Sequence, residues 1–469
     1  MRRLTSFVLV YRRILLSYKE RNQVDFKDKK VAIVDVDLFE RKKHRFPNLV
    51  CEKISAYFKE KGASVTLESN YHYLPDLFKY DYVFVAKVFT DTEIPDCKWL
   101  DPKRIENTTS FRRLIPDFKN ATETPMGVPA YFNISVEQWM KRMIFCEPGK
   151  TKIYIGGTGF FFDKAFSLPT EIEHHMPDYH LYDDWIEEQV LNGSNRAIIE
   201  HRLFNETVFR SQFKEYTDFS IGFLTRGCFR KCKFCVNQKY NRVFIHSPLS
   251  EFYDPERKKI CMLDDNFFGG RGWKPLFEEL VETNKPFKFK QGLDERLLTD
   301  EICKSLFSAK YSGDFTFAFD NIADYNLIHR KLKMIRKYTD VIKIKFYVLV
   351  GFESTDIHDI ENAFKRIALL MKYRCLPYIM RYQNKNEMPW KNSEYREAYV
   401  TLARWCNQPG IFKKMSFRNF CERDQFYHKT DRLCASMRAL KKLEAEDKEL
   451  ADTYFDMRFD NITTNPVKD

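Results

Sequence analysis

The stretch FSIGFLTRGCFRKCKFC, residues 219–235, joins a strand-like run of small and apolar residues to a cysteine-rich loop. The loop places Cys228, Cys232 and Cys235 at spacings of four and three residues. Three thiolates this close repel one another and oxidise easily, because the thiolate is the reactive form of cysteine. The spacing therefore predicts that a bound group holds the three side chains together.

From this strand onward, strand-like and helix-like segments alternate. The expected strands cover residues 219–225, 258–265, 287–294, 315–320, 341–352 and 376–383. The expected helices cover residues 273–284, 299–310 and 325–338, and a fourth presents Ile360, Phe364, Ile367 and Met371 on one face. Six such units predict a curved parallel sheet, here a partial, TIM-like (β/α)6 barrel over residues 216–384. Functional residues of such sheets gather at the carboxyl ends of the strands, where the cysteine loop is expected.

A separate alternation precedes this barrel. Strands are expected at residues 31–39, 64–69, 80–89 and 152–157. A helix is expected at residues 48–61, with Val50, Ile54, Tyr57 and Phe58 on its buried face and Gly62 at its C-terminal cap. Strands and helices joined by short links predict a Rossmann-like domain over residues 1–165.

The remaining two regions are less regular. Residues 166–215 are interpreted as a connector that contains a helix at residues 182–191. Residues 385–469 are expected to be mostly helical, and residues 437–459 predict one charged amphipathic helix. The predicted fold class is therefore α/β, with a Rossmann-like domain, a partial barrel and a helical C-terminal region.

Composition limits the class of protein. The chain has 469 residues, 44% of them hydrophobic, and a formal net charge of +12. A basic surface favours an anionic partner or substrate, but a solvated lysine-rich surface is the favoured explanation of the charge. Twelve cysteines in so long a chain do not resemble a secreted disulfide scaffold. Without a run of 18 apolar residues, the sequence predicts no membrane span and a cytoplasmic location.

The cysteine loop fits an iron–sulfur cluster better than a zinc ion. Structural zinc needs four ligands, and the nearest other cysteines, Cys261 and Cys303, belong to an ordinary strand and helix pattern. His246 is near in sequence, but its spacing does not favour a fourth ligand. Three thiolates on a four-iron cluster leave one iron without a protein ligand. That open position could bind a substrate or a cofactor.

The spacing C-x3-C-x2-C, with Phe234 before the third cysteine, resembles the signature of the radical S-adenosylmethionine (SAM) superfamily. The resemblance extends to the segments GFLTRGCFRKCKFCVN (222–237), MLDDNF (262–267), FKQGLDERLLTDE (289–301) and VLVGFEST (348–355). More narrowly, the chain is similar over roughly residues 30–380 to members that carry a cobalamin-binding-like domain before the barrel.

This resemblance implies that Cys228, Cys232 and Cys235 bind three irons of a [4Fe–4S] cluster. The fourth iron would take the amino and carboxylate groups of SAM, and one electron would cleave SAM to methionine and a 5′-deoxyadenosyl radical. The radical would act on an unidentified substrate, and flavodoxin or ferredoxin would supply the electron. Two alternatives stay open: a cobalamin-dependent radical SAM methyltransferase, and a non-catalytic protein that binds iron–sulfur or zinc.

The resemblance also implies residues that bind SAM at the strand ends. Asp264 and Asp265 would meet its amino group, and the alternative for each is a loop cap. Gln291, Asp294 and Asp320 would meet the ribose or the substrate.

The last two strands and the cysteine loop add further candidates. Gly351 would allow close approach of the adenine. Arg381 would hold the SAM carboxylate, with a surface salt bridge as the alternative. Arg226 and Lys231 flank the cysteines and would tune the charge of the cluster, unless they only solvate the loop.

The N-terminal domain departs from the cobalamin pattern D-x-H-x-x-G. In the loop DVDLFERKKHRFPNL, residues 35–49, His44 is present, but Lys42 replaces the aspartate and Pro47 replaces the glycine. The expectation is a cobalamin-domain fold without the cobalt ligand, so cobalamin is possible as a cofactor but not favoured. The turn GGTGF, residues 156–160, could cradle a phosphate, although a plain strand-end turn is favoured.

The C-terminal cysteines allow a second cluster. Such auxiliary clusters occur in several radical SAM families, and the candidate ligands are Cys375, Cys406, Cys421 and Cys434. No CxxC pair occurs among them, so buried thiols are the favoured interpretation.

Overall fold

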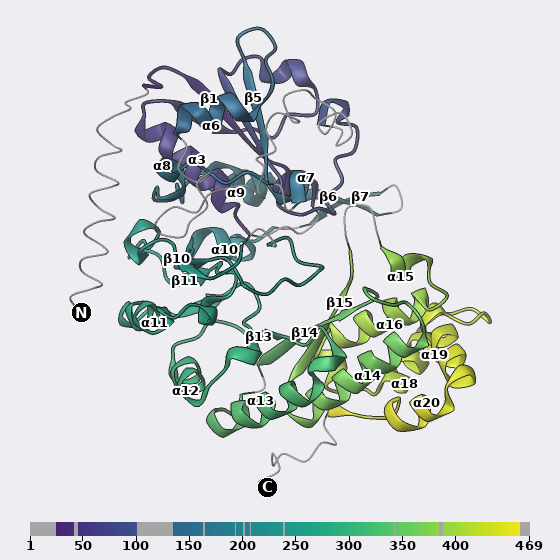
Figure 1. Ribbon diagram of the computed structural model, residues 1–469. Helices are drawn as coiled ribbons and strands as arrows, with labels where there is room; N and C mark the ends of the chain where they lie inside the picture. Colours follow the sequence, from purple (N-terminus) through teal and green to yellow (C-terminus); the bar gives the residue numbers. More distant parts are fainter. Residues whose placement is uncertain are drawn as a thin grey trace. The chain divides into compact units, whose positions relative to one another are not determined.

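The computed structural model describes residues 25–41, 46–100, 135–162, 165–192, 194–199, 202–206, 208–237, 240–341, 343–383 and 388–459 (Figure 1). These residues form two compact units. Unit 1 holds the described residues of Met1–Gly222 together with Ser247–Ile260, and unit 2 holds those of Phe223–His246 and Cys261–Asp469. Both units combine helices with sheets, so the coarse α/β prediction is confirmed. The four-part division of the chain stays a prediction.

Unit 1 is built on a five-stranded sheet in the order β2-β1-β3-β5-β4. The pairs β1–β2, β1–β3 and β3–β5 are parallel, and β4–β5 is antiparallel. The main elements are β1 Lys30–Asp35, α2 Val36–Glu40, α3 Leu49–Glu60, β2 Ser64–Leu67, β3 Tyr82–Ala86, α6 Val136–Met143, β4 Ile144–Cys146, β5 Lys152–Gly156, α7 Thr158–Phe161, α8 Thr170–Glu173, α9 Asp183–Asn192, β6 Ser194–Ile199, β7 Arg202–Glu206, α10 Lys214–Thr217 and β8 Phe219–Gly222. The parallel, Rossmann-like strands were predicted, whereas the edge strand β4 and the β6–β7 hairpin in the connector were not.

Two details of the predicted N-terminal elements are wrong. The run at residues 31–39 is not one strand, because the Asp35 side chain accepts a hydrogen bond from the Leu38 N–H and caps α2. On α3, Val50 is 38% exposed, while Cys51 is fully buried. The boundaries of α3 agree with the prediction: Asn48 caps its start, and Gly62, with a φ of 83°, follows its end.

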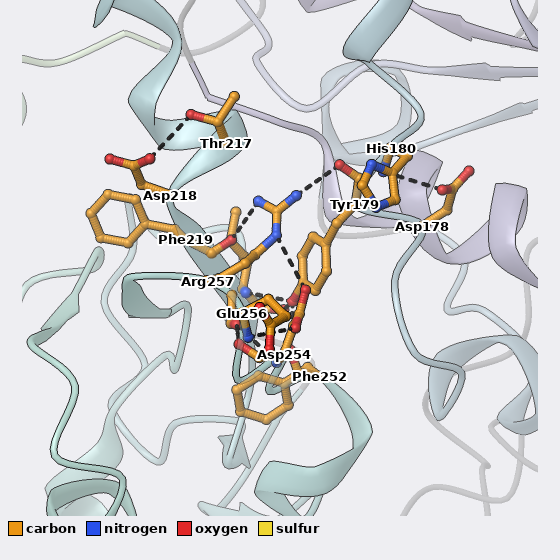
Figure 2. A network of polar contacts seen from close by, with 12 residues as sticks. Asp178, Tyr179, His180, Thr217, Asp218, Phe219, Phe252, Asp254, Glu256 and Arg257 are labelled. Atoms are coloured by element: carbon orange, nitrogen blue, oxygen red, sulfur yellow. Dashed lines mark hydrogen bonds and ion pairs between the residues drawn. The ribbon is translucent and has the colours of Figure 1, made fainter.

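A buried arginine joins three segments of unit 1 (Figure 2). Arg257 donates to the backbone oxygens of Phe219 at 3.0 Å and of Tyr179 at 2.8 Å, and also to that of Tyr216. The Tyr179 hydroxyl accepts from the Ile221 N–H at 2.7 Å. Segments far apart in sequence are therefore fixed around one guanidinium group, which sits 4.1 Å from the Tyr179 ring centroid.

In unit 2, strands that follow one another in the sequence are neighbours in the sheets. β12 lies next to β11, and β13, β14 and β15 form a parallel sheet. A parallel bridge between Leu293 and Phe317 connects the segment after β12 to β13. The strands are β9 Thr225–Arg226, β10 Phe244–Ile245, β11 Lys259–Met262, β12 Phe287–Phe289, β13 Phe315–Ala318, β14 Ile344–Val350 and β15 Leu376–Arg381. The first two residues of β11, Lys259 and Ile260, belong to unit 1. This order is what the repeated β/α pattern predicts, and curvature into a partial barrel stays a prediction.

The helices of unit 2 lie between and after these strands (Figure 1). They are α11 Trp273–Glu282, α12 Asp300–Ser308, α13 Tyr325–Tyr338, α14 Ile357–Lys372, α15 Pro389–Asn392, α16 Arg396–Cys406, α17 Pro409–Phe412, α18 Phe417–Tyr427, α19 Ala435–Glu446 and α20 Lys448–Tyr454. The predicted face of α14 is confirmed, since its four apolar residues are buried. The prediction of one helix over residues 437–459 is wrong. Asp447 follows the last residue of α19, and its side chain caps the start of α20.

None of the helices in the described ranges has the length and apolarity needed to cross a membrane.

Candidate functional site

The cysteine loop belongs to unit 2 and leaves all three thiols partly exposed. Cys228, Cys232 and Cys235 form no disulfide and are neither fully buried nor fully exposed. Burial raises the pKa of Cys232 and of Cys235, and the neighbouring thiols of the loop act in the same direction. The three sulfur atoms therefore affect one another electrostatically, as the sequence predicts.

Asp265 fixes both ends of this loop. Its carboxylate accepts the backbone N–H of Gly227 at 2.8 Å and the side-chain amide of Asn237 at 2.6 Å. Gly227 directly precedes the first cysteine, and Asn237 lies two residues after the third. One carboxylate at the end of β11 thus closes the loop around the cysteines.

Asp264 holds the segment that leads into the loop. It is 3% exposed and accepts the Thr225 N–H at 2.5 Å, the Thr225 hydroxyl at 2.6 Å and the Leu224 N–H at 3.4 Å. Burial raises the pKa of Asp264 to about 7, although these donors oppose the shift. Both aspartates therefore act as loop caps in the structure, and their predicted contact with SAM stays a prediction.

A second network connects Cys228 to the segment after β12. Asn266 donates from its side-chain amide to Cys228 Sγ at 3.4 Å and to Asp294 Oδ2 at 3.3 Å. Asp294 also accepts from Arg230 Nε at 2.8 Å and from Arg296 Nε at 2.6 Å. Burial raises the pKa of Asp294, but the two arginines outweigh it and hold the pKa below its usual value.

The residues of the loop suit a thiolate-bound cluster. Cys228 Sγ accepts the Arg230 N–H at 3.3 Å, and Cys235 Sγ accepts the Asn237 N–H at 3.4 Å. Hydrogen bonds of this kind to sulfur are among the features that set the potentials of iron–sulfur clusters. In the described ranges, no three His, Cys, Asp or Glu side chains are already gathered as a metal site. The donor chemistry fits, and closing the thiols around a cluster would be coupled to its binding.

Gly227 is required by the path of the loop. Its φ is +87°, and a Cβ placed there would lie 2.3 Å from the carbonyl oxygen of Arg242. We expect Gly227→Ala to lower the melting temperature and to reduce the iron taken up on reconstitution with iron and sulfide. Gly313→Ala is the matched control, since its φ is +94° with open space around the position. Iron analysis and thermal unfolding of both variants would check this, and equal behaviour of the two would contradict it.

A cavity of about 380 Å³ adjoins the loop. Its walls come from Lys231–Phe234 of the loop, from the ends of β13 and β14, and from α14. Phe234 of the loop packs edge-on against Phe352, with ring centroids 5.6 Å apart. The cavity therefore lies at the carboxyl ends of the strands, where the sequence places the site.

Charged groups line this cavity. Burial raises the pKa of Asp320 to about 6 and that of Glu295 to about 8. Arg366 donates to the backbone oxygens of Asp320 and Leu349, both at 2.9 Å. Asp320 and Cys232 thus line the same cavity, and contact of Asp320 with the ribose or the substrate stays a prediction.

The structure gives other partners to two predicted residues. Gly351 has a φ of +67°, and a Cβ there would lie 2.7 Å from the side chain of Trp390. Arg381 stacks over the same tryptophan at 4.5 Å. The strand β12 ends at Phe289, five residues before the end of the predicted strand at residue 294. Gln291 therefore lies after the strand, where its side chain is exposed. The roles of these three residues toward SAM stay predictions.

The flanking residues of the loop also have protein partners. Arg226 lies 3.9 Å from the Phe223 ring centroid, and Lys231 donates to the Tyr240 backbone oxygen. The ring of His246 packs near those of Phe223 and Phe244, at 6.2 and 6.4 Å between centroids.

The four C-terminal cysteines are buried, which agrees with the favoured interpretation as buried thiols.

In unit 1, the GGTGF turn serves close packing. A Cβ at Gly157 would lie 2.1 Å from the Lys87 backbone oxygen, and the Gly159 N–H donates to that oxygen at 2.9 Å. These contacts agree with the strand-end turn. His44 and Lys42 lie outside the described residues, so the prediction about cobalt remains as it stands.

Sequence reasoning missed four residues of the site: Arg230, Asn237, Asn266 and Arg296. One signal was available, because Asn266 continues the polar run Asp264–Asp265 inside the apolar segment MLDDNFF.

No protein-family model matches the chain. No curated protein matches it either. Three chains among the solved structures match. One is a cobalamin-dependent S-adenosylmethionine radical enzyme, OxsB, with aqua-cobalamin and S-adenosylmethionine bound. It has a TM-score of 0.36 and 11% sequence identity over 92% of this chain, which spans 65% of the length of OxsB. At this TM-score, the likeness is too weak to assign a fold or a function.

Proposed function

We propose that this protein is a radical SAM enzyme in which Cys228, Cys232 and Cys235 hold a [4Fe–4S] cluster. The observation that carries the proposal is the anchored cysteine loop. Asp265 ties its two ends together, and a cavity at the strand ends adjoins its middle. A loop that served only as a surface connection would not need a half-buried carboxylate, Asp265, whose two oxygens hold its two ends.

When bound, the cluster supplies one electron that breaks the C5′–S bond of SAM, giving methionine and a deoxyadenosyl radical that removes a hydrogen atom from the substrate. The chain's own residues would position the cluster and the substrate and exclude water from them. Asp264 and Asp265 fix the loop, and Phe234 with Phe352 covers one side of the cavity. Asp320 offers an acceptor for a hydroxyl group of SAM or of the substrate.

The partners belong to the same proposal. The electron would come from a flavodoxin or a ferredoxin in the cytoplasm. The substrate would be anionic, a choice supported by the net charge of +12 and by the exposed Lys231 and Lys233 beside the cavity.

The test is reductive cleavage of SAM. Protein purified and reconstituted with iron and sulfide under anaerobic conditions is mixed with SAM and dithionite, and 5′-deoxyadenosine is measured by mass spectrometry. We expect release by the natural protein and none by Cys232→Ala. Equal release by both proteins would refute the proposal. Bound iron without any 5′-deoxyadenosine would instead support a non-catalytic cluster protein.

A further inference from the structure

The side chain of Asn266 lies at the centre of the network beside Cys228. It is 3% exposed, and its amide nitrogen contacts Cys228 Sγ and Asp294 Oδ2. Within the described part of the chain, its Oδ1 is buried and accepts no hydrogen bond. A buried amide with one unused end is costly, so its presence here calls for an explanation.

The orientation of this amide is fixed by charge. An ionised carboxylate is only an acceptor, so Asp294 must face the NH2 end of Asn266. Two arginines hold Asp294 ionised and in place, at 2.8 Å from Arg230 and 2.6 Å from Arg296. The second N–H of the same amide is therefore directed at Cys228 Sγ.

Arg230, one of these two arginines, also contacts Cys228 through its own backbone N–H. The Arg230 N–H donates to Cys228 Sγ at 3.3 Å, while its side chain binds Asp294. The sulfur is thus connected to Asp294 twice, once through Asn266 and once through Arg230. Both connections end in an N–H group that points at the sulfur.

We infer that Asn266 is a positioning residue that raises the reduction potential of the cluster held through Cys228. This inference rests on the proposed function. An N–H···S bond withdraws charge from the thiolate and stabilises the reduced cluster, which carries one more negative charge. Asn266 acts on the cluster through the cysteine and touches no reacting atom of the substrate.

The experiment compares two variants with a matched control. Asn266→Leu removes the donor in a side chain of similar size, and Asn266→Asp removes it and adds a negative charge. Asn192→Asp places the same charge at an exposed position in unit 1. The midpoint potential of each reconstituted protein is measured at pH 8 by anaerobic titration with dithionite, with electron paramagnetic resonance as the readout.

We expect both Asn266 variants to have a lower midpoint potential than the natural protein, with the larger shift in Asn266→Asp. We also expect both variants to bind the cluster iron at least about 10-fold more weakly in competition with a chelator, because residues that contact metal ligands commonly have effects of this size on metal affinity. Asn192→Asp should change neither quantity. Since Oδ1 has no partner, leucine adds no orphaned acceptor at this position, and thermal unfolding confirms that each variant is folded.

Three outcomes overturn the inference, and they are distinguishable. If the natural protein forms no cluster, the proposed function and this inference fail together. If the natural protein forms a cluster and folded Asn266→Leu keeps its potential, this inference fails alone. A loss of iron without a shift in potential would mean that Asn266 only packs against the loop, and it would also overturn the inference.

Discussion

Replacing Cys232 with alanine is expected to remove the bound iron and sulfide and the visible absorbance of the cluster. Three thiolates leave one iron of a four-iron cluster open, and two would leave a second iron without a protein ligand. Cys232 is also the cysteine that lines the cavity, so no other thiol of the loop can take its place there. The loss should therefore be nearly complete. Iron and sulfide analysis of the anaerobically reconstituted protein would measure it.

The matched control is Cys146→Ala. Cys146 is also a free thiol of intermediate exposure, and it lies in β4 of unit 1. This variant should keep the iron and sulfide of the natural protein. Full iron and sulfide in Cys232→Ala would show that the cluster, if there is one, is held elsewhere. Zinc is measured on the same samples, because zinc in place of iron would favour the structural alternative.

The repeated pattern of the barrel-like region was predictable from sequence because its signals are local. α13 covers Tyr325–Tyr338, the predicted residues, since its apolar positions recur at helical spacing. The break between α19 and α20 was missed, because the amphipathic pattern continues across it. There the Asp447 side chain accepts the Leu450 N–H at 2.8 Å, and a local cap overrides the periodicity.

The candidate site was predictable only in part, for a related reason. The cysteines are recognised by their spacing, and Asp320 by its place at a strand end. The roles of Asp264 and Asp265 depend on partners about 40 residues earlier, such as Thr225 and Gly227. Hydrogen bonds between a loop and the next strand follow from tertiary packing, and no periodicity in one sequence encodes them.

Replacing Arg257 with methionine is expected to destabilise unit 1 strongly. The side chain is buried and donates to the backbone oxygens of Tyr179 and Phe219 (Figure 2). It also donates to the backbone oxygen of Tyr216. Methionine fills similar space but leaves these acceptors without their donor. Each orphaned buried acceptor costs about 1–3 kcal/mol, so the loss of a donor to three of them should cost at least about 3 kcal/mol. For a unit of this size, the melting temperature should fall by about 6 °C or more.

Arg210→Met is the control for loss of an arginine in the same unit. Arg210 is 61% exposed and pairs with Glu187 at the surface, so its loss should cost less than about 1 kcal/mol. Differential scanning calorimetry of the two variants and the natural protein would compare the transitions. A melting temperature of Arg257→Met equal to that of Arg210→Met would contradict the structural role of the buried guanidinium.

Arg257→Lys separates the charge of this group from its geometry. Lysine keeps the positive charge near Asp254, whose carboxylate lies 3.8 Å from Arg257 Nε. Its single ammonium cannot reproduce the planar fork that reaches carbonyl groups on separate segments. If hydrogen bonding dominates, Arg257→Lys should lose most of what Arg257→Met loses. If charge dominates, the melting temperature of the lysine variant should be close to that of the natural protein. Because the nearest acid is 3.8 Å away while two carbonyl contacts are 2.8 and 3.0 Å, we expect hydrogen bonding to dominate.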